Sequence, residues 1–167
     1  MQAIVAVTEN WGIGKDGQLL FHIKDDLRRF KKLTMGHTVV MGRRTLESLP
    51  GGKGLPGRRN VVLTTDKTFA APGAEVVHTP LAALFSAGLE DFCIGGERTY
   101  RTLLPSCDKV FVTKIYETVP ADAFFPDLDA DPEWKISYAS PMKEENGVKY
   151  RFVNYVRREN DPYAFCR

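Results

Sequence analysis

The sequence predicts an α/β fold, in which a parallel sheet has helices on both faces and an antiparallel edge at its C-terminal end. Short apolar runs rich in β-branched residues alternate with segments of helical spacing, a pattern typical of β-α-β units. The last two strand-like segments follow one another without a helix between them, so we expect them to pair as a hairpin. With 167 residues, 43% apolar and 26% charged, the chain has the size and composition of one soluble domain.

The first half of the chain alternates between the two spacings. Residues 3–7 are a short apolar run closed by Asn10 and two glycines, and are predicted to form a buried strand. Residues 25–35 have apolar side chains at helical spacing and are predicted to form a helix. Residues 38–41 and 60–64 are again β-branched runs, and we expect two further strands there.

The second half repeats the alternation and then changes. Helices are expected at residues 79–87 and 96–103, each behind a plausible capping residue. Each helix is followed by a predicted strand, at residues 91–94 and 109–116. Residues 134–140 and 148–157 are longer strand-like segments separated by Glu-Glu-Asn-Gly, which favours a hairpin. We therefore expect one domain over residues 1–158, followed by an irregular tail at 159–167.

The composition argues against several classes of protein. No apolar run approaches the roughly 18–20 residues that a membrane span requires. Met1 is followed directly by a strand-like run, without a basic region or a cleavage site, so we expect a cytoplasmic protein. Cys93, Cys107 and Cys166 are an odd number at wide spacing, which favours neither a disulfide framework nor a metal site.

Charge is unevenly distributed along the chain. The net charge is +2, yet residues 24–67 contain eleven basic and four acidic residues, so this segment carries +7 and the remainder −5. Such a segment is either a solvated face or a contact surface for a partner with several negative charges.

A glycine motif follows the first predicted strand. Gly12, Gly14 and Gly17 match the G-x-G-x-x-G pattern of dinucleotide-binding turns. That turn must open a helix, but the next helical segment begins only near Asp25, and no acidic residue lies about twenty positions further on to hold a ribose. We therefore interpret the segment as a flexible loop that crosses a site.

Asp26 is the first candidate for chemistry. At roughly 100° per residue it falls in the same arc as Leu27, Phe30 and Leu33. Asp25 projects to the opposite side, with the basic residues Arg28, Arg29, Lys31 and Lys32. Both acids could simply stabilise the helix N-terminus. A carboxylate in an apolar arc is desolvated, however, which raises its pKa and suits it to proton chemistry or to binding a cationic heterocycle.

Thr113 and Arg58 are two further polar candidates. Thr113 shares a strand face with Phe111 and Ile115, and a buried hydroxyl needs a partner, either within the sheet, on the carboxylate or on a substrate. Arg58 follows a Leu-Pro-Gly turn and precedes a strand. Unless the turn is merely solvated, this arginine is suited to bidentate binding of a carboxylate.

Two strand-to-helix turns, at residues 41–45 and 94–100, combine glycines with arginines and hydroxyls. Turns of this kind at the carboxyl edge of a parallel sheet bind phosphates. Thr64 and Thr65 end a neighbouring strand, so the three segments together predict a site for a large phosphorylated ligand.

Together, these motifs resemble the dihydrofolate reductase family, in its bacterial chromosomal type, over residues 3–157. Seven pieces occur in one order, and they are Trp11-Gly-Ile-Gly14, Asp26-Leu-x-x-Phe30-Lys, Val39-Val-Met-Gly42-Arg-x-Thr45-x-Glu-Ser, Leu55-Pro-Gly-Arg58-x-Asn60, Ile94-Gly-Gly-x-x-x-Tyr100, Thr113 and Phe125-Pro-Asp. The resemblance implies a central eight-stranded, mostly parallel sheet with four flanking helices. It also implies reduction of 7,8-dihydrofolate to tetrahydrofolate by NADPH, inhibition by antifolates, and a monomer.

The resemblance assigns roles to individual residues. Asp26 would bind the pteridine and favour protonation of N5 through a water, supported by Thr113, with Leu19 and Phe21 beside the reacting atoms. The remaining substrate-binding residues would be Val5, Ala6, Leu27, Phe30, Leu49, Leu55, Arg58, Ile94 and Tyr100, with Arg58 on the α-carboxylate of the glutamate tail. The cofactor-binding residues would be Ala6, Ile13, Gly14, Gly17, Gly42, Arg43, Arg44, Thr45, Leu63, Thr64, Thr65, Ile94, Gly95, Gly96, Glu97, Arg98 and Thr99. Residues 13–20 would be a mobile loop over the nicotinamide, held by Asp122.

The chain departs from the family pattern at Phe21, where Trp is usual, and at Lys24, where Pro is usual. Phenylalanine cannot donate the hydrogen bond that an indole gives to an ordered water. Three other functions compete with the reductase. They are a reductase of the same fold acting on a ribosylaminopyrimidine, a nucleic-acid-binding module that uses the basic segment, and an inactive nucleotide-binding relative. The basic residues lack interleaved exposed aromatics, so we expect no nucleic-acid partner. The short apolar runs predict no membrane partner.

Overall fold

The computed structural model describes residues 1–158, and the predicted tail at 159–167 lies outside the described residues. The main sheet contains β1 (Gln2–Val7), β4 (Thr38–Gly42), β5 (Arg59–Leu63), β6 (Ala74–Val77), β7 (Phe92–Gly95), β8 (Lys109–Ile115), β10 (Trp134–Ala139), β11 (Lys143–Glu145) and β12 (Val148–Arg157). The four α-helices of the described chain are α1 (Lys24–Thr34), α2 (Arg43–Ser48), α3 (Pro80–Phe85) and α4 (Glu97–Leu103). None of these helices is long and apolar enough to span a membrane.

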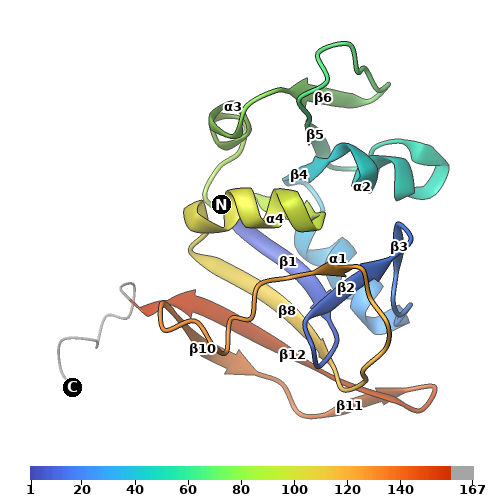
Figure 1. Ribbon diagram of the computed structural model, residues 1–167, viewed down its shortest axis with the longest axis vertical. Helices are drawn as coiled ribbons and strands as arrows, with labels where there is room; N and C mark the ends of the chain where they lie inside the picture. Colours follow the sequence, from blue (N-terminus) through green and yellow to red (C-terminus); the bar gives the residue numbers. More distant parts are fainter. Residues whose placement is uncertain (159–167) are drawn as a thin grey trace.

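Eight strands of the main sheet lie in the order β10-β12-β8-β1-β7-β4-β5-β6, and the short β11 pairs with β12 outside this path. All pairs from β8 to β6 are parallel, whereas β12 is antiparallel to β8 and to β10. The predicted α/β fold, with eight mostly parallel strands, four helices and an antiparallel C-terminal part, is confirmed (Figure 1).

The helices cover both faces of the sheet, and each face has its own apolar core. Side chains of α3 and α4, including Ala83 and Leu103, pack with one set of strand residues. Phe30 of α1 and Leu46 of α2 pack with the set that faces the other way. In Figure 1, α4 lies in front of β1 and α1 lies behind it.

A gap in strand pairing opens beside β1. Its whole length pairs with β8, from Gln2 to Val7, but its pairing with β7 is confined to Gln2 and Ala3. Beyond Ala3 the carboxyl ends of β1 and β7 therefore separate. Ligands of open α/β sheets bind at such points, where neighbouring connections leave the sheet in opposite directions.

Parts of the structure differ from the sequence predictions. The segment Gly12–Gly17, predicted to be a loop, contains strand β2 (Gly12–Lys15), which forms a small sheet with β3 (Gln18–Leu19) and β9 (Ala123–Phe124). Asp16 and Gly17 have positive φ values of 52° and 75°, which allows the tight turn that joins β2 to β3. The C-terminal hairpin also differs, because β11 and not β10 lies directly across the Asn146-Gly147 turn from β12.

Candidate active site

Asp26 lies in the first turn of α1 and is held against the sheet by a hydrogen bond. Thr113 Oγ1 of β8 donates to Asp26 Oδ1 at 2.5 Å. Burial raises the pKa of Asp26, while the Thr113 hydrogen bond and the charge of Arg29 lower it and the charge of Asp25 raises it. Burial has the largest effect, so the structure places at the start of α1, against β8, a carboxyl group whose pKa is raised.

Asp25 has a different environment from its neighbour. Tyr150 of β12 donates its hydroxyl to Asp25 Oδ2 at 2.8 Å, and Arg28 and Lys143 lie at ion-pair distances of 3.9 and 3.8 Å. Neither aspartate caps α1. The carboxylate of Glu145 instead accepts hydrogen bonds from the backbone N–H groups of Lys24, at 2.8 Å, and Asp25, at 3.4 Å.

Arg29 contradicts the expectation that it shares the solvated side of the helix. Its guanidinium carbon lies 4.2 Å from the centroid of the Phe152 ring, and Nη2 donates to Asn154 Oδ1 at 3.2 Å. The helical wheel assumed one buried face, but β12 covers a second side of α1. Arg29 is therefore half-buried.

Four apolar residues of the expected substrate pocket pack against one face of the sheet. Phe30, Leu49, Leu55 and Ile94 pack around the same apolar cluster of the sheet. Leu27 is 43% exposed and so lies on the open side of α1. Phe30 follows Asp26 by one turn on α1, so an apolar surface and a carboxyl group are neighbours on this helix, an arrangement suited to an aromatic heterocycle with a polar edge.

Arg58 is positioned by two hydrogen bonds. Its Nη1 donates to Thr34 Oγ1 at 3.2 Å and its Nε to the Pro56 carbonyl at 2.9 Å. Within residues 1–158 it has no carboxylate partner, and partial burial lowers its pKa. Sequence reasoning gave no role to Asn60, which is buried and bonds to the backbone of Leu55 and Arg58, so that it fixes the turn.

The two glycine turns meet, as the sheet order requires. A Cβ added to Gly42 would lie 2.8 Å from Thr99 Oγ1, and one added to Gly96 would lie 3.3 Å from Thr45 Oγ1. Gly95 has φ of 130°, a conformation that favours glycine. Backbone and two hydroxyls thus form a narrow cradle that side chains would fill, which fits the close approach of a phosphorylated ligand.

The other residues expected at the cofactor site have varied surroundings. The guanidinium of Arg43 is already bound by Glu47 at 2.7 Å and Asp66 at 3.0 Å, whereas no ion pair involves Arg44 or Arg98 in the described part of the chain. Leu63 pairs with Gly42 and is followed by Thr64 and Thr65, and His78 Nδ1 lies 2.8 Å from the Thr64 carbonyl. Glu97 accepts a hydrogen bond from the Phe124 backbone at 3.1 Å, which ties α4 to β9.

The segment from Gly12 to Phe21 closes over the end of β1. Ile13, Leu19 and Phe21 line a hollow of about 10 Å³ together with Ala6. Gly14 lies in β2 and Gly17 in the turn beside it. Asp122 accepts from the Asp16 backbone at 2.9 Å and donates its own N–H to the Gly14 carbonyl at 3.0 Å, so it holds this hairpin as expected.

Val5 and Tyr100 complete the wall between β1 and α4. Both are buried, and Tyr100 donates its hydroxyl to the Ile4 carbonyl at 2.6 Å where β1 and β7 separate. Burial raises the pKa of Tyr100 well above its usual value, so it remains a neutral donor.

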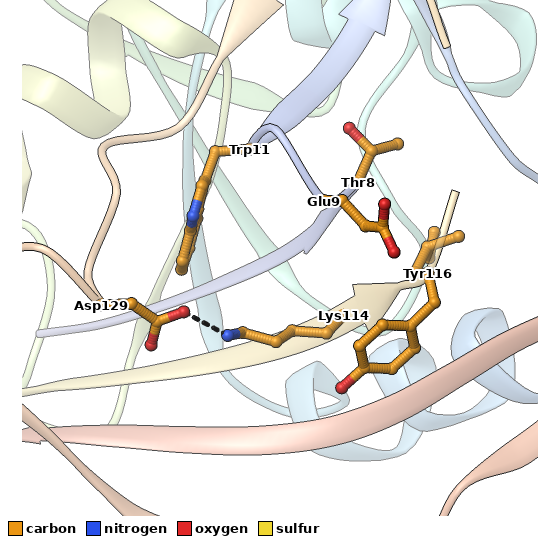
Figure 2. A pocket seen from close by; sticks show the side chains of 7 residues that line it. Thr8, Glu9, Trp11, Lys114, Tyr116 and Asp129 are labelled. Carbon is orange, nitrogen blue, oxygen red and sulfur yellow. Dashed lines mark hydrogen bonds and ion pairs between the residues drawn. The ribbon is translucent and has the colours of Figure 1, made fainter. Parts of the chain in front are cut away.

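A larger hollow of about 160 Å³ lies at the end of β8 and contains none of the predicted site residues. Figure 2 shows Lys114 crossing it towards Asp129, with Trp11 on one side and Tyr116 on the other. Lys114 and Asp129 form an ion pair there. Neither Asp26 nor its partner Thr113 lines this hollow.

The fold and the site define a class of protein, an α/β enzyme with a partly buried acid on α1 and two glycine turns suited to a nucleotide. The dihydrofolate reductase family model matches residues 1–157. The dihydrofolate reductase of Bacillus subtilis (strain 168) is 36% identical over 161 residues, covering 94% of each chain. That of Staphylococcus aureus (strain Mu50) is 35% identical over 149 residues, covering 88% of this chain and 91% of the relative.

A solved structure, dihydrofolate reductase from Enterococcus faecalis complexed with NADP(H) and RAB-propyl, has 33% identity, a TM-score of 0.83 and 96% coverage of both chains. The chain belongs to the dihydrofolate reductase family.

Proposed function

We propose that the chain reduces 7,8-dihydrofolate to 5,6,7,8-tetrahydrofolate with NADPH, and so supplies one-carbon metabolism and thymidylate synthesis. Family membership carries the activity, and the single structural observation that supports the chemistry is the partly buried Asp26 carboxyl group bonded to Thr113. Phe30 follows Asp26 by one turn on α1 and packs with the apolar cluster of the sheet, so we place the pterin between this apolar surface and the carboxyl group. Hydride transfer needs a dry, oriented slot more than it needs a nucleophile.

Substrate binding uses the two polar anchors at opposite ends of the apolar wall. Asp26 accepts hydrogen bonds from the pterin 2-amino group and N3, while Phe30, Val5 and Ala6 pack on the ring. Arg58 binds the α-carboxylate of the glutamate tail. The lack of a carboxylate partner for Arg58 among residues 1–158, and its fixed position on Thr34, support this role.

The two glycine turns suit NADPH because backbone without a Cβ can approach a ligand closely. NADPH supplies the hydride when it is bound. Gly42, Gly95 and Gly96 allow close approach of its phosphates, with Thr45 and Thr99 as hydroxyl donors. Near the 2′-phosphate we place Arg44, which has no ion pair in the described chain, together with Thr64 or Thr65. Arg43 contributes less directly, since Glu47 and Asp66 already bind it.

Proton delivery depends on the ionisation of Asp26. Burial raises the pKa of this carboxyl group, so it favours a proton on the bound pterin and protonation of N5 through a water. Phe21 has no N–H group to donate to that water, so the orientation of the water depends on Asp26 and on Thr113.

The activity is tested by mixing the protein with NADPH and dihydrofolate and following the loss of reduced-nicotinamide absorbance. We expect turnover that requires both reactants and is abolished by an antifolate. Absence of turnover with folded protein would contradict the proposal. We further propose a cytoplasmic monomer, which sedimentation of the purified protein tests for its oligomeric state.

A further inference from the structure

Arg29 is a half-buried cation of α1 to which the reaction proposed above gives no role. We infer that Arg29 is a positioning residue for the Asp26 carboxyl group, because its guanidinium is held by β12, the strand next to that of Thr113, and keeps a positive charge one helical turn from that carboxyl. The inference rests on the proposed role of Asp26 in catalysis.

Arg29 contacts residues of β12, which pairs with β8, the strand that carries Thr113. Phe152 is paired in register with Thr113, and Asn154 with Phe111. The Arg29 guanidinium stacks on Phe152 at 4.2 Å, lies 5.7 Å from the Phe111 ring and donates to Asn154 at 3.2 Å. A planar cation that stacks and donates in this way has one favoured position, so its charge is fixed relative to the helix.

Arg29 lies one turn after Asp26 on the same helix, and such i, i+3 pairs are neighbours on the helix surface. The positive charge of Arg29 lowers the pKa of Asp26, and the negative charge of Asp26 raises that of Arg29, so the two groups act on one another. Half-burial strengthens this attraction, because water screens it less than it would on an exposed surface.

The other charged groups around the pair are accounted for. Asp25 opposes Arg29 by raising the pKa of Asp26, and it is itself bonded to Tyr150 and ion-paired with Arg28 and Lys143. The remaining titratable groups that face this region are Tyr138 of β10, Glu145 of β11 and Lys109 of β8, whose ammonium lies over Phe111. Arg29 is the cation with a resolved effect on Asp26 among the described residues.

A purely structural role for Arg29 makes a different prediction from a charge-bearing role. If Arg29 only packs α1 against β12, its replacement lowers stability and leaves the titration of Asp26 unchanged. If its charge matters, a neutral side chain raises the pKa of Asp26 while lysine retains most of the effect. Arg28 is the matched control, because it is the adjacent arginine, is 73% exposed and pairs with Asp25.

The test compares wild type, Arg29→Met, Arg29→Lys and Arg28→Met by two readouts. The first is the carboxyl carbon NMR titration of Asp26 without ligands, and the second is the pH profile of single-turnover hydride transfer. For Arg29→Met we expect both midpoints to move upward by about half to one pH unit, as for loss of a nearby opposite charge that is partly screened. Arg29→Lys keeps most of the wild-type midpoint, and Arg28→Met does not raise it.

Equal midpoints in wild type and Arg29→Met, or an equal shift in Arg29→Lys, would overturn the inference. Arg29→Gln keeps a donor for Asn154 without the charge, and must shift the midpoint in the same direction if Arg29→Met fails to fold. The NMR titration does not need turnover. An inactive wild type would therefore refute the proposed function, while the titration still decides the role of Arg29.

Discussion

Replacing Thr113 by valine removes one hydroxyl from the site while nearly keeping the shape of the side chain. Thr113 is 3% exposed, and its hydroxyl donates to Asp26 at 2.5 Å. A hydrogen bond to a charged group is worth about 1.5–3 kcal/mol and one between neutral groups about 0.5–1.5 kcal/mol. The difference of about 1–1.5 kcal/mol corresponds to about one pKa unit, so we expect Thr113→Val to raise the pKa of Asp26 by about that amount.

The same substitution has a pH-dependent effect on stability. Burial already raises the folded-state pKa of Asp26 above its unfolded-state value. The contribution of Asp26 to the free energy of unfolding is therefore most favourable below the unfolded-state pKa and is lost as pH rises through the folded-state pKa. Thr113→Val raises that value further. We expect the free energy of unfolding to fall by about 1.5–3 kcal/mol near neutral pH, where the ionised form loses its donor, and by about 0.5–1.5 kcal/mol in acid.

Urea denaturation followed by circular dichroism, in neutral and in mildly acidic buffer, measures both values. Thr113→Ser is the control, because it keeps the donor and loses only a methyl group, so its cost should not depend on pH. An equal loss for Thr113→Val in both buffers, or no loss near neutral pH, would refute the reasoning.

Three further predictions concern activity and binding. Asp26→Asn should slow turnover by about a hundredfold or more near neutral pH, as for loss of an acid-base group, while Asp25→Asn should leave it nearly unchanged; similar rates for the two variants in the NADPH assay would reverse the assignment. Arg58→Leu should weaken binding of folates by about ten- to hundredfold without affecting analogues that lack the glutamate, as fluorescence titration would show, and unchanged folate affinity would place Arg58 outside the site. Gly42→Ala should weaken NADPH binding about tenfold or more, since its Cβ would meet Thr99 Oγ1 at 2.8 Å, and calorimetry that finds wild-type affinity would argue against the cradle.

The fold was predictable where burial imposes a clear spacing on the sequence. β1, β4 and β5 are short apolar runs buried on both faces, and α1 has a regular apolar stripe. The edge strand β6 was missed because its residues are only half-buried or exposed. The hairpin of β2 and β3 was missed because its strands are very short and depend on pairing with β9, more than a hundred residues later.

The candidate site was predictable only in its local part. An acid within an apolar arc and a threonine on a buried strand face identified Asp26 and Thr113, which the structure joins. No local pattern reveals that Glu145 caps α1 from about 120 residues away, or that β12 covers Arg29. Both contacts form only when the C-terminal strands β11 and β12 pack against α1. Asn60 could have been found, since a buried amide after a Pro-Gly turn has to bond to the backbone around it.

The most direct test of the proton chemistry is the single-turnover rate of hydride transfer from NADPH to dihydrofolate, measured for wild type and Asp26→Asn across pH. If Asp26 governs protonation of N5, the variant is much slower than wild type near neutral pH. The difference must narrow in acid, where the solvent can protonate the substrate. A deficit that does not change with pH, or no deficit at all, would contradict the role of Asp26 in proton delivery.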